Sequence, residues 1–169
     1  MVLSTDERAA RFDEIYRAHF NDVLLYAYRR LRDRTAAEEV AQEAFIVFWR
    51  QHAGVREPVR PWLYGVARNL LANEFRHRQR QPQLVELGEE DGSRGGGLDG
   101  VDDVVDVRRA LLRLSAADRE LLMLVGWDGL SVQEAAVSLR CSALTLSVRL
   151  FRARNRLLKA LDATTRTGR

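Results

Sequence analysis

The chain has 169 residues, a formal net charge of +3, and 30% charged and 46% hydrophobic residues. This length suits one ordinary domain or two small ones, and no apolar run approaches the roughly 20 residues of a membrane-spanning helix. The polar, acidic N-terminus does not resemble a signal peptide, and the single cysteine, Cys141, excludes an internal disulfide or a cysteine-based zinc cluster. We therefore expect a cytoplasmic protein with neither cofactor nor metal.

Residues 12–33 form the first predicted helix, because apolar side chains recur there at steps of three and four. They are Phe12, Ile15, Tyr16, Phe20, Val23, Ala27 and Leu31. Four arginines crowd the C-terminal end of this segment, where the helix dipole favours cations. We interpret this helix as scaffold.

A second helix is predicted from about 35 to 52, opened by a capping box of Thr35 and Glu38. Its predicted buried side comprises Val40, Ala41, Ala44, Phe45 and Phe48. The opposite side carries Glu39, Gln42, Glu43, Ile46, Trp49 and Arg50. Ile46 and Trp49 lie one turn apart in this polar company, which favours a docking site for a partner helix. Ordinary packing within the chain is the alternative.

The segment 53–60 should be a loop because it contains Gly54 and Pro58. A third helix then runs from Pro61 to about residue 80, with one apolar side formed by Leu63, Val66, Ala67, Leu70, Leu71 and Phe75. The other side is basic and rich in amides, and comprises Trp62, Arg68, Asn69, Asn73, Arg76, His77 and Arg80. Arginine neutralises phosphate, asparagine reads base edges and tryptophan stacks on unpaired bases. This face therefore suits nucleic acid, with a solvated helix face and a Trp folded onto the core as the alternative.

Charge and composition change abruptly in the next segment. Residues 83–106 carry eight acidic side chains against Arg94 alone, together with a glycine-rich run. Residues 140–169 carry eight basic side chains against Asp162 alone. Two basic blocks around an acidic connector indicate a polyanion partner contacted at two places. A structureless loop of this length within one domain would be unusual, so we predict two helical domains, 1–80 and 104–169, joined by a flexible linker at 81–103.

The second unit has the pattern of a helix-turn-helix. Helices are predicted near 104–114 and from Ser115, and a capping box of Ser131 and Glu134 opens a short helix that ends near Leu139. A tight turn at 140–142 leads to a long helix from Ala143 to about residue 161, packed through Leu146, Leu150, Ala153, Leu157 and Leu161. In this motif the start of the second helix enters the major groove. Candidate DNA-binding residues are Thr145, Ser147 and Arg149 near the bases and Arg152, Arg156 and Lys159 on phosphates. A solvated basic face on a helical bundle is the alternative.

Together these segments resemble a bacterial RNA polymerase sigma factor of the extracytoplasmic-function (group IV) class, over residues 11–80 and 104–161. Three stretches carry the resemblance in the expected order: residues 37–50 (AEEVAQEAFIVFWR), 62–69 (WLYGVARN), and 130–136 (LSVQEAA) with Arg152-Ala153-Arg154. The resemblance implies a two-domain, all-α promoter-recognition subunit. It also implies that Glu39, Gln42, Glu43, Ile46 and Trp49 bind the polymerase core, through the coiled coil of the β′ subunit.

The resemblance further assigns the two DNA elements and the partners. The helix with Trp62, Arg68, Asn69, Asn73, Arg76 and Arg80 would recognise and help melt the −10 element, and the preceding loop would capture a flipped base. The helix-turn-helix with Thr145, Ser147, Arg149, Arg152 and Arg156 would read the −35 element. Implied partners are core RNA polymerase (β′ and β subunits), promoter DNA and an anti-sigma factor.

The chain departs from the family pattern in its helix-turn-helix. The family usually has glycine at the positions of Arg140 and Leu144, and a Thr-Val-Lys-Ser-Arg pattern where this chain has residues 145–149 (TLSVR). Leu144 and Val148 near the groove leave fewer phosphate contacts, so we expect a weaker or unusual −35 contact. Two other classes of protein are the alternatives. A stand-alone helix-turn-helix regulator needs neither the Ile46–Trp49 face nor Trp62 on a basic helix, and the sequence contains no enzyme motif.

Overall fold

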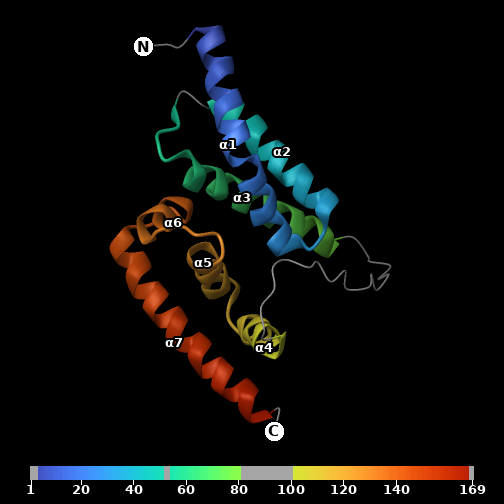
Figure 1. Cartoon of the computed structure of the whole chain (residues 1–169), viewed down its shortest axis with the longest axis vertical. Coiled ribbons are helices and arrows are strands. Elements are labelled where there is room, and N and C mark those ends of the chain that lie inside the picture. Colours follow the sequence, from blue (N-terminus) through green and yellow to red (C-terminus); the bar gives the residue numbers. More distant parts are fainter. Residues whose placement is uncertain (1–3, 52–53, 81–100, 168–169) are drawn as a thin grey trace.

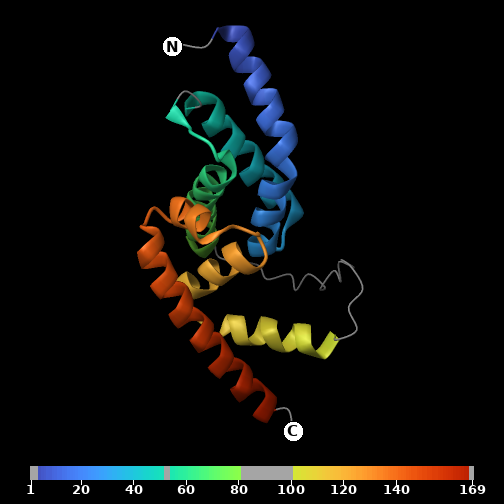
Figure 2. The ribbon, with the colours of Figure 1, turned by 60° about the vertical axis from the view of Figure 1, so that its left-hand side comes forward.

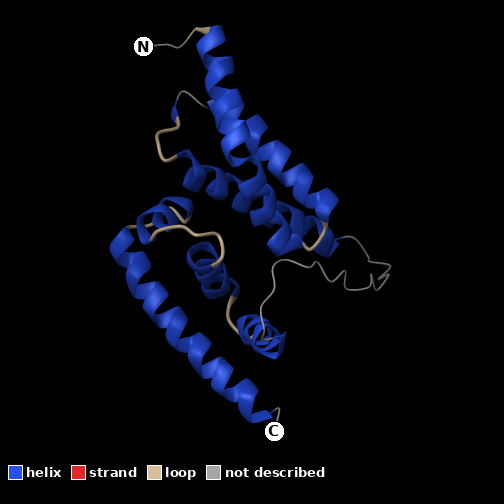
Figure 3. Cartoon of the chain, in the orientation of Figure 1, coloured by secondary structure: helices blue, strands red, loops and turns tan. Residues whose placement is uncertain are grey.

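The structure is a computed structural model that describes residues 4–51, 54–80 and 101–167. Within these ranges the chain consists of helices joined by short turns and loops, without a strand (Figure 3). The helices are α1 (Thr5–Leu31), α2 (Arg34–Gln51), α3 (Val59–Arg80), α4 (Val101–Leu112), α5 (Ala116–Gly126), α6 (Val132–Ser138) and α7 (Ala143–Thr167) (Figure 1). No helix of the described part is long and apolar enough to cross a membrane.

The first three helices pack together into the N-terminal unit, and α4 to α7 form the C-terminal unit (Figures 1 and 2). This arrangement confirms the predicted all-α fold of two small helical domains. Most of the predicted linker lies outside the described residues, and its last three positions, 101–103, already belong to α4.

Helix starts depend on capping side chains that apolar periodicity does not reveal. α1 begins at Thr5 instead of Phe12 because Ser4 and Glu7 form a capping box, with the Glu7 amide 3.2 Å from Ser4 Oγ. The prediction that Thr35 caps the start of α2 was wrong. The Asp33 carboxylate accepts the Ala36 amide at 3.0 Å, and Glu38 instead pairs with Arg34 at 2.8 Å.

Aromatic rings fill the contact between α1 and α2. Phe12, Tyr16 and Phe20 of α1 meet Phe45 and Phe48 of α2, with ring centroids between 5.0 and 6.2 Å apart. Such edge and offset contacts add to the burial of apolar area. On α3, Leu63, Ala67 and Leu71 are buried as predicted. Phe75 was predicted on the same buried side but is 42% exposed, one turn beyond the last buried residue of α3.

The helix-turn-helix forms as predicted in the C-terminal unit. Ser131 and Glu134 make the expected capping box at the start of α6, which holds the pKa of Glu134 below its ordinary value through the Ser131 amide. The turn at 139–142 places Arg140 at φ 52°, in the left-handed region where glycine is favoured. Leu146, Leu150 and Ala153 then bury one face of α7 against the rest of the unit.

The two units touch through α3 and α6, which lie side by side in Figures 1 and 2. A Cβ added at Gly65 of α3 would lie 3.2 Å from the carbonyl oxygen of Ser138, so the glycine permits close approach of the two helices. The Ser138 hydroxyl donates to the Pro61 carbonyl at 2.7 Å. Arg60 donates to the Gly129 carbonyl at 3.2 Å. These polar contacts lie beside apolar side chains of α3 and α6 that belong to one continuous core cluster.

Four charged side chains, Arg29 and Arg30 of α1 with Glu120 and Asp128 of the C-terminal unit, form what we call the interdomain ion cluster. Arg30 lies 2.7 Å from Glu120 and 2.8 Å from Asp128, and Arg29 lies 2.8 Å from the other Asp128 oxygen. The side chains of Asp128 and Arg30 are 0% and 7% exposed, so these charges are desolvated as well as paired.

Two tyrosines line the interdomain ion cluster. The Tyr26 hydroxyl donates to Glu120 at 2.7 Å, and the Arg30 guanidinium lies 3.6 Å from the centre of the Tyr26 ring. Burial, reinforced by Glu120, raises the pKa of Tyr26 well above its ordinary value. Burial also raises the pKa of Tyr64, which stacks on Tyr26 at 4.6 Å, to about 12. Both phenols therefore stay neutral at physiological pH.

Candidate functional surfaces

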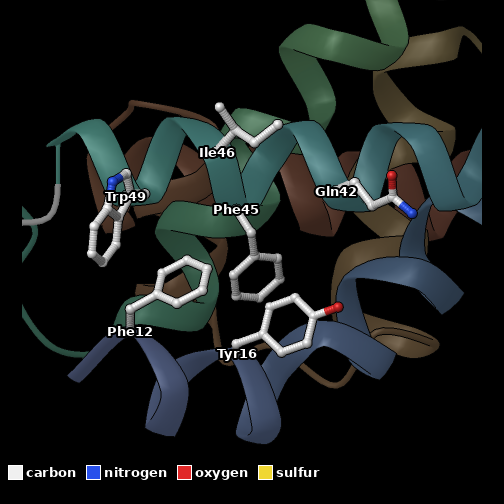
Figure 4. Close-up of a pocket in the computed structure, with 6 residues that line it drawn as sticks. All are labelled: Phe12, Tyr16, Gln42, Phe45, Ile46 and Trp49. Atoms are coloured by element: carbon white, nitrogen blue, oxygen red, sulfur yellow. The ribbon is translucent and has the colours of Figure 1, made fainter. Parts of the chain in front are cut away.

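An apolar groove of about 250 Å³ opens between α1 and α2. It is lined by Phe12, Tyr16, Gln42, Phe45, Ile46 and Trp49, which Figure 4 shows around the hollow between the two helices. Ile46 and Trp49 are 42% and 37% exposed, and Glu39, Gln42 and Glu43 are exposed beside them. The structure thus brings the five residues predicted for core binding onto one surface. It adds Phe12 and Tyr16 of α1, which periodicity had assigned to the scaffold.

Contacts from α1 hold Trp49 in place at one end of this groove. Its ring lies edge-on to Phe12 with centroids 5.2 Å apart, and the Arg8 guanidinium lies 4.5 Å from the ring centre. Arg8 also donates to the Trp49 carbonyl at 2.7 Å. A large aromatic that is fixed on one side and open on the other is pre-organised to receive an apolar side chain.

The predicted basic face of α3 is open to solvent. Arg68, Asn69, Asn73 and Arg76 are all exposed, and Arg76 bonds to the Asn73 side chain and to the Ala72 carbonyl. The side chain of Arg80 lies outside the described residues. The structure therefore places the two amides and two of the arginines on one accessible surface.

Trp62 does not lie fully on that basic face. Its ring meets Phe48 edge-on with centroids 6.0 Å apart, and it is partly buried against the core of the N-terminal unit. The helical wheel put Trp62 with the arginines, but a ring this large also reaches the neighbouring helix. The alternative interpretation, a Trp folded onto the core, describes its inner part, while its remaining surface stays accessible.

The predicted DNA-binding residues of α7 differ in their solvent exposure and in the hydrogen bonds and ion pairs that they already make. Thr145 and Ser147 are exposed, but the Thr145 hydroxyl accepts from Ser142 at 2.8 Å and the Ser147 hydroxyl donates to the Ala143 carbonyl at 2.9 Å. Arg152 is exposed and Arg149 is half-buried. Arg156 pairs with Asp118 at 2.7 Å, so phosphate binding there must compete with this carboxylate.

A second face of α7 carries apolar side chains in solvent. Leu144, Val148, Phe151 and Leu158 are 77%, 44%, 67% and 59% exposed. From the sequence, Leu144 and Val148 stand out only as departures from the family pattern, and Phe151 does not stand out at all. Their spacing of four, three and seven residues was the available signal, because it marks one face of a helix.

Two families match the two units in the order of the chain. Residues 15–81 match Sigma-70 region 2, and residues 105–157 match Sigma-70, region 4. The first covers α2, α3 and most of α1, and the second covers α5, α6, most of α4 and the first part of α7.

Similar proteins span nearly the whole chain. RNA polymerase sigma-H factor of Pseudomonas aeruginosa is 31% identical over 93% of this chain and 88% of its own. ECF RNA polymerase sigma factor SigM of Bacillus subtilis is 30% identical over 88% of this chain and 93% of its own.

Solved structures show the same fold. The sigma factor RpoE from Bartonella quintana, crystallised in complex with the anti-sigma factor NepR, has a TM-score of 0.67 at 25% identity over 90% of this chain and 97% of that chain. CnrH, solved with the cytosolic domain of CnrY, has a TM-score of 0.64 at 23% identity over 90% of this chain and 88% of that chain. With both regions matched in order, the chain belongs to the extracytoplasmic-function group of RNA polymerase sigma factors.

Proposed function

We propose that the groove between α1 and α2 is where this sigma factor docks on core RNA polymerase. The observation that carries this proposal is an accessible apolar groove whose rim is polar and acidic. Ile46 and Trp49 offer the apolar anchors, while Glu39, Gln42 and Glu43 border them. A desolvated centre with a polar rim is the usual design of a protein interface. The occupant is a helix of the coiled coil in the β′ subunit.

The −10 element is read by α3 in this proposal. Asn69 and Asn73 contact base edges, and Arg68, Arg76 and Arg80 neutralise phosphates. Trp62 contributes only its accessible edge, because its inner side packs on Phe48. Transcription starts when the duplex opens, so an aromatic edge beside amides suits unpaired bases at this site.

The −35 element is read by α7. Its first turns enter the major groove, with Thr145, Ser147 and Arg149 near the bases and with Arg152 and Arg156 toward the phosphates. Arg156 must exchange Asp118 for a phosphate to contribute. The three units of the proposal are thus residues 1–80, 81–103 and 104–169, working as polymerase-binding and −10 domain, connector, and −35 domain.

The two DNA-contacting surfaces must separate before they can act together. The −10 and −35 elements lie about 25 base pairs apart, or about 85 Å at 3.4 Å per base pair. Gly65 of α3 touches Ser138 of α6. Asn69 lies about 6 Å along the helix from Gly65, and Thr145 is at most about 25 Å of chain from Ser138. The two surfaces are therefore less than about 40 Å apart in this closed arrangement, and the connector must let them part.

The same surfaces are those that an inhibitor would cover. RpoE, whose fold is similar, was crystallised in complex with an anti-sigma factor. We extend this to the present chain: an anti-sigma factor binds it and keeps it from polymerase until a signal releases it.

Transcription in vitro tests the proposal. Purified protein and core RNA polymerase are incubated with a fragmented genomic library, and start sites are mapped by sequencing. Discrete starts that share motifs near −10 and −35 are expected. No specific initiation, together with tight duplex binding by the protein alone, would instead indicate an operator-binding regulator.

A further inference from the structure

The outward face of α7 is apolar at the positions nearest to the DNA in a helix-turn-helix. Leu144 is the second residue of α7, and Val148 follows one turn later. At 100° per residue, Leu144, Val148 and Phe151 lie within about 60° of one another and about 160° from the buried stripe of the helix. Figures 1 and 2 show α4, α5 and α6 on one side of α7, which leaves the opposite side uncovered. The face is therefore available to a ligand.

Polar side chains in the same two turns are engaged by the helix itself. Ser142 Oγ accepts the Thr145 amide at 3.1 Å and donates to the Thr145 hydroxyl, and Ser147 donates to the Ala143 carbonyl. These bonds cap and brace the start of α7. The surface of these two turns that can contact a base edge is therefore mostly aliphatic, because Leu144 is 77% and Val148 is 44% exposed.

Only one base presents a methyl group in the major groove. Thymine carries a C5-methyl group there, whereas the other three bases and the remaining thymine edge offer hydrogen-bond donors and acceptors. A leucine or valine that reaches a cytosine or guanine edge would desolvate polar groups without replacing their hydrogen bonds. An aliphatic groove-facing surface therefore favours thymine at the position that it touches.

We propose that Leu144 and Val148 are specificity-determining residues that select thymine in the −35 element through its C5-methyl group. This inference rests on the proposed function, in which α7 reads that element. Arg152 is exposed beside the aliphatic face and holds an adjacent phosphate. The charge of α7 favours DNA over a second copy of the chain, because two such helices would bring arginines against arginines.

Removing single methyl groups from the DNA tests the proposal. The strongest promoter from the start-site map is synthesised with each −35 thymine replaced in turn by deoxyuridine, which differs only by that methyl. Binding of the complete holoenzyme is then measured by competition. We expect about a fourfold loss at one or two thymines, the factor that corresponds to one buried methyl group. Deoxyuridine outside the −35 element should have no effect.

Protein variants identify the side chains that respond. Holoenzyme that carries Leu144→Ala or Val148→Ala should lose the response at the thymine that the replaced side chain contacts. It should bind the promoter equally well with thymine or with deoxyuridine at that position. Leu158→Ala is the matched control, since Leu158 lies on the same exposed face about three turns beyond Val148 along α7. It should keep the full fourfold response. Circular dichroism checks that each variant remains folded, as expected for side chains in solvent.

The outcomes separate this inference from the proposed function. Absence of specific initiation would overturn the function itself. Specific initiation with a −35 element that responds equally to thymine and deoxyuridine at every position would overturn the methyl readout alone. A loss of polymerase binding in Leu144→Ala and Val148→Ala, with the deoxyuridine response intact, would also overturn it and assign the face to a protein partner.

Discussion

Replacing Arg30 by alanine should open the two units of the protein without unfolding them. Arg30 is the shared partner of Glu120 and Asp128, and its side chain is 7% exposed. Arg30→Ala leaves Asp128 with Arg29, which is 34% exposed, and leaves Glu120 with only the neutral Tyr26 hydroxyl. A carboxylate without a cation in a desolvated site is unfavourable, and separation of the units returns it to water.

The magnitude follows from the burial of the cluster. Removal of one partner from a buried ion pair costs about 3–5 kcal/mol. At 1.4 kcal/mol for each factor of ten, this lowers the ratio of closed to open molecules by about 100-fold to about 4,000-fold. The free energy of unfolding of each unit should change much less, because the Arg30 guanidinium bonds mainly across the interface. Arg17→Ala is the control, since Arg17 and Asp13 are an exposed pair within α1.

Small-angle scattering of the full chain measures the opening directly. The radius of gyration should increase in Arg30→Ala and remain at the wild-type value in Arg17→Ala, while helix content by circular dichroism stays constant in both. The reasoning would be refuted if Arg30→Ala kept the compact radius. It would also be refuted if helix content collapsed together with the radius, because the cluster would then be holding α1 rather than the interface.

Three further substitutions have defined outcomes. Ile46→Glu should abolish co-purification with core polymerase while leaving the melting temperature unchanged. Leu25 of α1 is equally exposed, and Leu25→Glu should change neither co-purification nor the melting temperature. A lower melting temperature in Ile46→Glu would mean that Ile46 is core. Gly65→Ala should favour the α3 helix by up to about 1 kcal/mol yet weaken closure, since its Cβ would lie 3.2 Å from the Ser138 carbonyl oxygen, so scattering should show a larger radius. Arg140→Gly should raise the free energy of unfolding by about 0.5–1 kcal/mol by relieving a left-handed backbone; an unchanged or lower value in urea titration would contradict this.

Helices and their buried faces could be predicted because they depend on local patterns. The apolar stripes of α2 and α7 were read from spacing alone, and Leu146, Leu150 and Ala153 are buried as predicted. The capping box of Ser131 and Glu134 was also visible in the sequence. These features need only neighbours three or four residues away. For the same reason, the surface positions of Ile46 and Arg68 followed directly from the helix assignment.

Contacts between distant segments could not be predicted. Nothing local relates Arg30 to Asp128, which lies 98 residues away, so the interdomain ion cluster was invisible in the sequence. Trp62 was misplaced because its neighbour, Phe48, belongs to another helix. The groove likewise depends on α1 crossing α2, so Phe12 and Tyr16 could not be assigned to it. Residue-level roles on these surfaces stay predictions until binding is measured.

The chemistry of the interdomain contact suits an interface that must open during function. An apolar interface would expose hydrocarbon to water when the units part, at about 25 cal/mol for each Å². The contact here joins the apolar cores of the two units, but it also contains ion pairs, the Ser138–Pro61 hydrogen bond and a glycine contact. Charges regain their hydration on separation, which offsets much of the Coulomb energy that is lost. These polar contacts thus fix the geometry of the closed arrangement, while hydration of the charges on opening regains part of their energy, as reading two elements about 85 Å apart requires.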